Sequence, residues 1–257
     1  DTTNEQWVLI VPFLVPPIKK DARGRPRRND REILDGILWI LRSGCQWKDL
    51  PKRYPPYQTC HRRFQEWSKR KVFTEILAVL AQDMETRGKI KLEECFIDGT
   101  FSSAKKGASG GKNETGKGNE DMAIVDQKSL PVAIHVDNAS PHEVTLVEKT
   151  LERKLTKGTP KRLVGDRAYD SDPLDQYLRK KGIEMIAPHR SNRRKKKTQD
   201  GRKLRRYKKR WKVERFNAWI QQFRRVVTRY EYCASHFLSF VQLACMMILL
   251  RIIFEIG

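Results

Sequence analysis

Short apolar segments alternate with amphipathic ones between residues 92 and 187, and this alternation limits the possible folds more than any other feature. The apolar segments have the length and composition of buried strands, whereas the segments between the later ones repeat their apolar side chains at helical spacing. The expected strands span 92–98, 122–125, 131–136, 163–166 and 183–187. Their order predicts an α/β domain with a mixed sheet and excludes a helical bundle or a β-sandwich.

The N-terminal third predicts short helices and no strands. One helix ends near Gly44, Thr59 can cap a second, and a third covers about 74–87. The exposed faces are basic, which is typical of a helix-turn-helix-like unit that contacts DNA, although a plain packing role remains the alternative. We therefore expect a small all-α domain at 1–90 and an α/β domain at 91–257.

The charge balance points to a polyanionic partner. The 257 residues include 53 Lys and Arg against 31 Asp and Glu, which gives a net charge of +22. Such an excess favours DNA, RNA or an anionic membrane surface as the partner. Thirteen of the 21 residues from 190 to 210 are Lys or Arg, and this basic arm is either a solvated loop or a phosphate-binding segment. In so basic a chain, contact with nucleic acid is the favoured interpretation.

One apolar stretch, 237–254, approaches the length of a membrane span. It contains Gln242 and Arg251, and it follows an amphipathic segment. We therefore predict a buried C-terminal helix, with a membrane-surface protein anchored by this stretch as the alternative. The five cysteines are widely spaced and lack zinc-binding spacing, which is typical of buried thiols in a reducing compartment.

A glycine-rich segment at 102–118 resembles a phosphate-binding loop only in part. Gly111 to Lys117 reads Gly-x-x-x-x-Gly-Lys, but Gly118 follows where Ser or Thr would hold Mg²⁺. A strand is also expected where such a loop needs a helix N-terminus. We interpret the segment as a mobile loop near DNA, with Lys117 as a candidate contact.

Two aspartates stand where the hydrophobic pattern predicts that strands end. Asp98 follows Cys-Phe-Ile, and Asp166 follows Leu-Val-Gly. A carboxylate at the end of a buried strand is costly unless it is hydrated, paired or bound to a metal ion. Taken alone, each aspartate is more typical of a turn or cap. Together in one mixed sheet, the two could bridge a divalent cation.

A third acid lies on a helix expected at about 204–229. Tyr207, Arg210, Glu214 and Gln221 fall within about 60° of one another on a helical projection, apart from the apolar face. The simpler interpretation is an Arg–Glu pair on a solvated face. The alternative is a metal-binding carboxylate beside a cation that grips DNA phosphate.

These segments match a known pattern. "FIDGT", "VGDRAYDSD" and "YKKRWKVERF" resemble the Asp-Asp-Glu (DDE) transposases of bacterial insertion sequences, in the insertion-sequence-four and -five groups. The last family motif is Tyr, two residues, Arg, three residues, Glu, six residues, Lys. Tyr207, Arg210 and Glu214 match it, whereas Gln221 stands at the Lys position. The resemblance extends over most of the chain.

The resemblance implies a ribonuclease H-like fold and a reaction. Asp98 on the first strand, Asp166 after the fourth and Glu214 on a later helix would be the catalytic, metal-binding acids. They would hold two Mg²⁺ ions, for which Mn²⁺ can substitute. The expected reaction is cleavage of the transposon ends and their transfer into target DNA by two-metal phosphoryl transfer. A catalytically inactive, domesticated descendant that binds DNA sequence-specifically is the alternative.

The resemblance also implies partners. Double-stranded DNA, as terminal inverted repeats and as target, would be bound by a homodimer in the bacterial cytoplasm, associated with the nucleoid and without a membrane. Tyr207, Arg210 and Gln221 would contact DNA near the acids. The other candidate DNA contacts are Lys117, Arg190, Arg193, Arg194, Lys195, Arg205 and Arg206.

Overall fold

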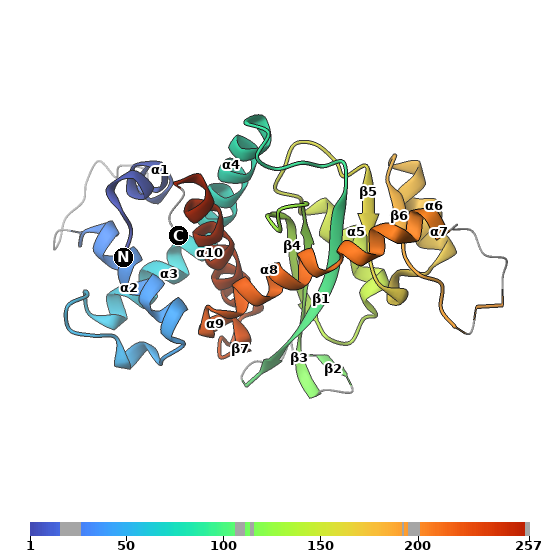
Figure 1. Cartoon of the computed structure of the whole chain (residues 1–257). Helices are drawn as coiled ribbons and strands as arrows, with labels where there is room; N and C mark the ends of the chain where they lie inside the picture. Colours follow the sequence, from blue (N-terminus) through green and yellow to red (C-terminus); the bar gives the residue numbers. More distant parts are fainter. Residues whose placement is uncertain (16–26, 106–110, 114–115, 192, 195–200, 255–257) are drawn as a thin grey trace.

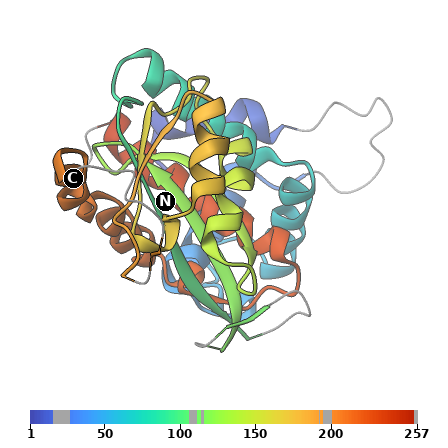
Figure 2. The ribbon, with the colours of Figure 1, turned by 90° about the vertical axis from the view of Figure 1, so that its right-hand side faces the viewer.

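The protein consists of a helical part and a sheet-containing part that share one core (Figure 1). The computed structural model describes residues 1–15, 27–105, 111–113, 116–191, 193–194 and 201–254. Within these residues the buried apolar side chains of both parts form one contiguous cluster. Seen from the side of α6 and β6 in Figure 2, the N-terminal helices lie behind the sheet.

Four α-helices build the N-terminal part. They are α1 (Asn4–Leu14), α2 (Asp30–Ser43), α3 (Tyr57–Lys69) and α4 (Val72–Thr86), with a 3₁₀ turn, η1 (Trp47–Asp49), between α2 and α3. Gly44 ends α2 in the left-handed conformation, with φ of 69°, as the sequence predicted. Thr59 does not cap α3, so that prediction was wrong. The N-cap is Pro56, three residues earlier, whose carbonyl accepts the first backbone hydrogen bonds.

The sheet is mixed, as expected. Its strands are β1 (Cys95–Ala104), β2 (Gly111–Asn113), β3 (Gly116–Val125), β4 (Pro131–Asn138), β5 (Arg162–Val164), β6 (Glu184–Ile186) and β7 (Thr228–Arg229). The order is β2-β3-β1-β5-β6, with β4 also paired to β3 and β7 to β1. β3 runs antiparallel to β1 and to β4, while β5 and β6 continue the sheet in parallel. Parallel strands need crossover connections, which α5 and α6 provide.

Helices cover the sheet and extend to the C-terminus. They are α5 (Glu143–Glu152), α6 (Asp172–Lys180), α7 (Gly201–Leu204), α8 (Trp211–Gln221), α9 (Arg224–Val227) and α10 (Ala234–Ile253), with 3₁₀ turns η2 (Arg167–Tyr169) and η3 (Arg205–Lys209). In Figure 1, α8 crosses the sheet over β1, and α8 packs on both β1 and β3. α5 packs on β3 and β4.

The single helix expected at about 204–229 is divided into α7, η3, α8 and α9, so that prediction was wrong. The chain leaves the helical conformation at Phe223. The turn brings Arg225 to the carbonyl of Cys45, at 2.9 Å, and Arg229 to the side chain of Asn119, at 2.6 Å. These buried contacts lie in different parts of the molecule, and a straight helix could not reach both.

The C-terminal helix α10 belongs to the core. Its length and composition alone would allow it to cross a membrane, but most of its residues from Phe237 to Leu250 are buried inside the protein. It packs against α4 and also touches β4, α8 and α9. In Figure 1 it lies among the N-terminal helices. The predicted buried C-terminal helix is therefore confirmed.

A buried polar network ties β7 to the centre of the sheet. Arg229 is fully buried and donates to Asn119 and to the carbonyl of Glu231. Nearby, the Ser102 hydroxyl donates to the carboxylate of Asp121. Burial, with a smaller contribution from the charge of Glu120, raises the pKa of Asp121 to about 8. Asp121 is therefore protonated in the folded protein at neutral pH.

Asp121→Asn is expected to change the pH dependence of stability. The pKa of Asp121 is higher in the folded than in the unfolded protein, so the wild type loses stability as pH rises from about 4 to 8. The asparagine cannot ionise, and the stability difference in favour of the variant should grow by about 1 kcal/mol per pH unit in this window. Urea unfolding at several pH values measures this difference, and parallel pH profiles for the two proteins would contradict the assignment.

Candidate active site

Asp98 lies inside β1, not at its end as expected. β3 pairs with β1 as far as Ser103, so the strand continues well past Asp98, which lies opposite Ala123. On the other side of β1, the parallel pairing with β5 ends at Phe96 and Val164. Asp98 therefore lies just beyond the point where β5 leaves the sheet, and this exposes its flank to the loop after β5.

Asp166 is in that loop. It follows β5 by two residues and caps the turn η2, where the backbone N–H of Ala168 donates to its Oδ1 at 2.7 Å. The sequence prediction that this aspartate follows a strand is confirmed. The turn fixes one carboxylate oxygen of Asp166 and holds the charge close enough to affect Asp98.

The start of α8 brings a guanidinium between the acids. Arg210 caps α8, and its Nη2 donates to Asp98 Oδ1 at 2.9 Å while Nη1 lies 3.7 Å from Glu214 Oε1. Asn217, two turns after Arg210, donates to Asp98 Oδ2 at 3.2 Å. Glu214 lies between them on the helix, with 57% of its side chain exposed. Both oxygens of Asp98 are thus held by residues on either side of Glu214.

The charges around Asp98 act in opposite directions. Burial is the largest effect and raises the pKa of Asp98, Arg210 lowers it, and the negative charges of Glu143 and Asp166 raise it, so that the pKa is about 6. Although burial lowers the pKa of Arg210, its contacts with Asp98 and Tyr207 and the charge of Asp166 raise it above the ordinary value. A single cation therefore interacts with Asp98, Asp166 and Glu214.

Two further acids lie beside β1, and sequence reasoning missed both. Glu120 on β3 and Glu143 at the start of α5 approach Gly99, the neighbour of Asp98. The hydroxyl of Tyr169 donates to Glu143 Oε2 at 2.7 Å. Burial, together with the charges of Glu143 and Asp98, raises the pKa of Glu120 to about 7. A glutamate in the first turn of a helix is common, so the sequence carried no specific signal for Glu143.

The donor chemistry of this region fits a hard divalent cation. Carboxylate oxygens are the ligands that Mg²⁺ and Mn²⁺ prefer, and buried carboxylates with a raised pKa favour a neighbouring positive charge. Within the described part of the chain, no three His, Cys, Asp or Glu side chains are already arranged around a common metal position. In this structure Arg210 provides the positive charge between Asp98 and Glu214.

Several predicted DNA contacts are exposed. Tyr207 lies in η3 and forms a side-chain hydrogen bond with Arg210, and Gln221 is exposed at the end of α8. Three cations are exposed as well, namely Lys117 on β3, Arg194, and Arg205 in η3. Lys195 lies outside the described residues.

Other arginines of the basic arm bind within the protein. Arg190 donates to the carbonyls of Arg167 and Ala168 at 3.1 and 2.8 Å. Arg193 binds Asp170 at 2.8 Å. In addition, Arg206 pairs with the buried carboxylate of Glu94. These contacts fasten both ends of the arm to the sheet-containing part.

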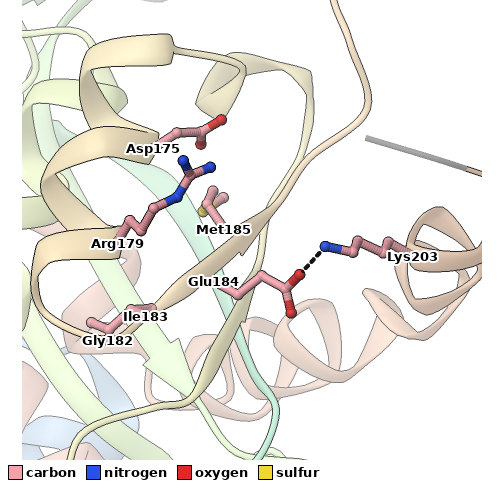
Figure 3. Close-up of a pocket in the computed structure, with 7 residues that line it drawn as sticks. All are labelled: Asp175, Arg179, Gly182, Ile183, Glu184, Met185 and Lys203. Atoms are coloured by element: carbon pink, nitrogen blue, oxygen red, sulfur yellow. Dashed lines mark hydrogen bonds and ion pairs between the residues drawn. The ribbon is translucent and has the colours of Figure 1, made fainter. Parts of the chain in front are cut away.

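The edge strand β6 adds another anchor near the C-terminal end of the arm. Figure 3 shows Lys203 of α7 pointing toward Glu184 of β6, with which it forms an ion pair. The same glutamate binds Arg162 of β5 at 3.2 Å. This region lines a cavity of about 380 Å³ that contains none of the three predicted acids. The ion pair between Lys203 and Glu184 therefore holds the C-terminal end of the arm at the sheet edge.

Two family models together cover most of the chain. Residues 2–77 match the family described as "Putative transposase of IS4/5 family". Residues 75–249 match the "Transposase DDE domain".

Two curated bacterial proteins are similar in sequence. The chain is 40% identical over 113 residues to "Uncharacterized protein y4sN" of Sinorhizobium fredii, a match covering 44% of this chain and 84% of that protein. It is 30% identical over 139 residues to "Putative transposase for insertion sequence element IS402" of Burkholderia cepacia, covering 51% of this chain and 62% of the relative.

The fold also has a structural relative. A piggyBac transposase, solved as a synaptic complex with hairpin DNA, aligns with a TM-score of 0.56 over 98% of this chain and 73% of its own, at 12% identity. The mixed sheet flanked by helices is thus the ribonuclease H-like fold that the sequence predicted. Because the DDE model matches well over half of the chain, the protein belongs to the DDE transposases of bacterial insertion sequences of the IS4/5 family, metal-dependent enzymes that cleave and join DNA.

Proposed function

We propose that Asp98, Asp166 and Glu214 form the catalytic centre at which this transposase cleaves transposon ends and joins them to target DNA. One observation carries the assignment: the Arg210 guanidinium contacts Asp98 and Glu214 and interacts with the charge of Asp166. Three acids from a strand, a turn and a helix therefore all interact with one cationic side chain, which supports their assignment to one centre.

We propose Mg²⁺ as the metal, with Mn²⁺ able to replace it. When bound by these carboxylates, the metal supplies positive charge that stabilises the phosphate and the nucleophile of an in-line displacement. Arg210 and Asn217 orient the Asp98 carboxylate through its two oxygens. Tyr207 orients Arg210, which is placed to bind the phosphate next to the bond that is cleaved.

The basic surface positions the DNA. The N-terminal helices, within 1–90, would recognise the transposon end, and the region 91–257 would carry the chemistry. Among the arginines of the arm, Arg190, Arg194 and Arg205 are exposed and suited to phosphate contacts. Arg193 is largely buried and paired with Asp170. Gln221 and Lys117 would add neutral and cationic contacts near the centre.

DNA affinity is expected to fall steeply with salt. If the arm and the helices neutralise six or more phosphates, affinity drops by about 10³-fold or more between about 50 and 200 mM salt. Arg205→Gln should lower the salt slope by about one counterion. The matched variant Arg193→Gln should change the slope less, because this side chain is only 11% exposed and is paired with Asp170. Fluorescence anisotropy with a labelled duplex measures all three slopes.

A homodimer on DNA is the proposed assembly, because joining two transposon ends at one target requires two active centres. We propose that the transposase acts at the nucleoid in the bacterial cytoplasm. Light scattering of the protein with a stoichiometric duplex end should give a mass of two chains and two duplexes. A complex with one chain would contradict the dimer.

A nicking assay tests the function. The substrate is a labelled duplex that carries the inverted repeat flanking the coding region, and Mg²⁺ is varied against EDTA. Nicking at the repeat boundary that requires Mg²⁺ or Mn²⁺ supports the proposal. Tight, specific binding with no nicking in either metal would instead support the inactive, DNA-binding descendant.

A further inference from the structure

We propose that Glu143, held in place by Tyr169, is an additional carboxylate of the metal centre and helps to bind the cation together with Asp98 and Asp166. This inference rests on the proposed function of that centre. It adds a residue from α5, which the three-acid motif does not include.

Tyr169 links Glu143 to the turn that carries Asp166. The tyrosine is fully buried at the end of η2, the turn that Asp166 caps. Its hydroxyl donates to Glu143 Oε2 at 2.7 Å. The turn therefore positions both acids, and movement of Asp166 and Glu143 relative to one another is restricted.

Gly99 lets Glu143 approach β1 immediately next to Asp98. A Cβ built on Gly99 would lie 2.9 Å from Cδ of Glu143, which is closer than real Cβ atoms approach, and 3.1 Å from its Cγ, which is a tight contact. With glycine at position 99, the Glu143 carboxylate can lie against the strand without having to shift. The negative charge of Glu143 acts on Asp98, and that of Asp166 acts on Glu143. Glu143 is thus close to both aspartates.

Glu120 is a separate observation that adds a buried acid at the same position. The residue is only 8% exposed, and its carboxylate points to the same position beside Gly99 and Glu143. No hydrogen-bond donor or basic side chain in the described ranges pairs with it. An unpaired buried carboxylate beside a second one is costly unless a proton or a cation compensates the charge, and a divalent cation bound by Glu143 would compensate both acids. Glu120 lies next to Glu143 and would add further negative charge near the cation.

The test measures metal binding directly as well as cleavage. Mn²⁺ binding to the full-length protein is followed by electron paramagnetic resonance, and the nicking assay is titrated with Mg²⁺. Glu143→Gln and Tyr169→Phe should each weaken Mn²⁺ binding and raise the Mg²⁺ requirement by about 10–100-fold. Glu152→Gln, an exposed glutamate on the same helix, is the matched control and should match the wild type.

Two measurements distinguish a loss of carboxylate positioning from a folding defect in these variants. Saturating Mg²⁺ should restore most of the cleavage rate of Tyr169→Phe, which a misfolded protein would not recover. If Glu143→Gln does not fold, as judged by thermal melting, Tyr169→Phe alone decides. Wild-type Mn²⁺ affinity in folded Tyr169→Phe and Glu143→Gln would overturn the inference.

Asp98→Asn distinguishes this failure from failure of the proposed function. If Asp98→Asn loses metal binding and cleavage while the Glu143 and Tyr169 variants do not, the three-acid centre stands without Glu143. If Asp98→Asn binds Mn²⁺ and cleaves like the wild type, the centre itself is wrongly assigned, and the inference fails with it.

Discussion

Asp98→Asn is expected to reduce strand cleavage by on the order of 1,000-fold or more while DNA binding is retained. The substitution keeps the shape of the side chain, so Arg210 can still donate to its remaining carbonyl oxygen. It removes the negative charge that would hold the cation. Cleavage of a labelled transposon end, measured beside anisotropy with the same duplex, separates the two effects.

Asp166→Asn and Glu214→Gln should give losses of similar size. The asparagine at 166 can still accept the hydrogen bond from Ala168, so the turn is preserved and the missing charge is the variable. Asp83→Asn, at an exposed ion pair with Arg87 on α4, is the control and should cleave normally. Full cleavage by all three active-site variants would remove the catalytic assignment.

Phe240→Ala is expected to lower the free energy of unfolding by about 3–5 kcal/mol. Phe240 is fully buried in α10 and stacks on Phe64 of α3 with ring centroids 4.4 Å apart, and Trp47 lies 6.2 Å away. The truncation leaves a cavity where the C-terminal helix joins the N-terminal helices. Urea unfolding followed by tryptophan fluorescence measures the loss.

Ile252→Ala provides the comparison on the same helix, because Ile252 is 38% exposed. It should cost well under half as much as Phe240→Ala. Equal costs at the two positions, or a wild-type protein that stays dispersed only in detergent, would contradict the assignment of α10 to the protein core.

Local patterns predicted strands β1, β3, β4, β5 and β6 in their order, but not the short strands β2 and β7. Strand and helix periodicities arise from neighbouring residues, so the mixed sheet and the buried C-terminal helix could be predicted. The boundaries of the helices and strands were predicted less well. β1 extends beyond Asp98 because β3 pairs with it, and the helix expected at 204–229 is broken at Phe223 because Arg225 and Arg229 have distant partners. Both differences result from contacts between residues far apart in the sequence.

In the candidate site as well, some features could be predicted from the sequence and others depend on tertiary contacts. Asp98, Asp166 and Glu214 could be selected from their motifs, and as catalytic residues they stay predictions. Their grouping around Arg210 depends on how α8 crosses β1. Arg193 also could not be separated from the exposed arginines of the arm, because its partner Asp170 is 23 positions away.

By itself the sequence predicted the class of fold, a polyanionic partner and the three candidate acids, since periodicity, net charge and motif residues are properties of the chain. Only the tertiary structure decided that Glu143 and Tyr169 lie beside the aspartates and that Glu120 is buried next to them. The reason is physical: a carboxylate acquires its role from burial and from the charges around it, and both exist only after distant strands and helices have packed together.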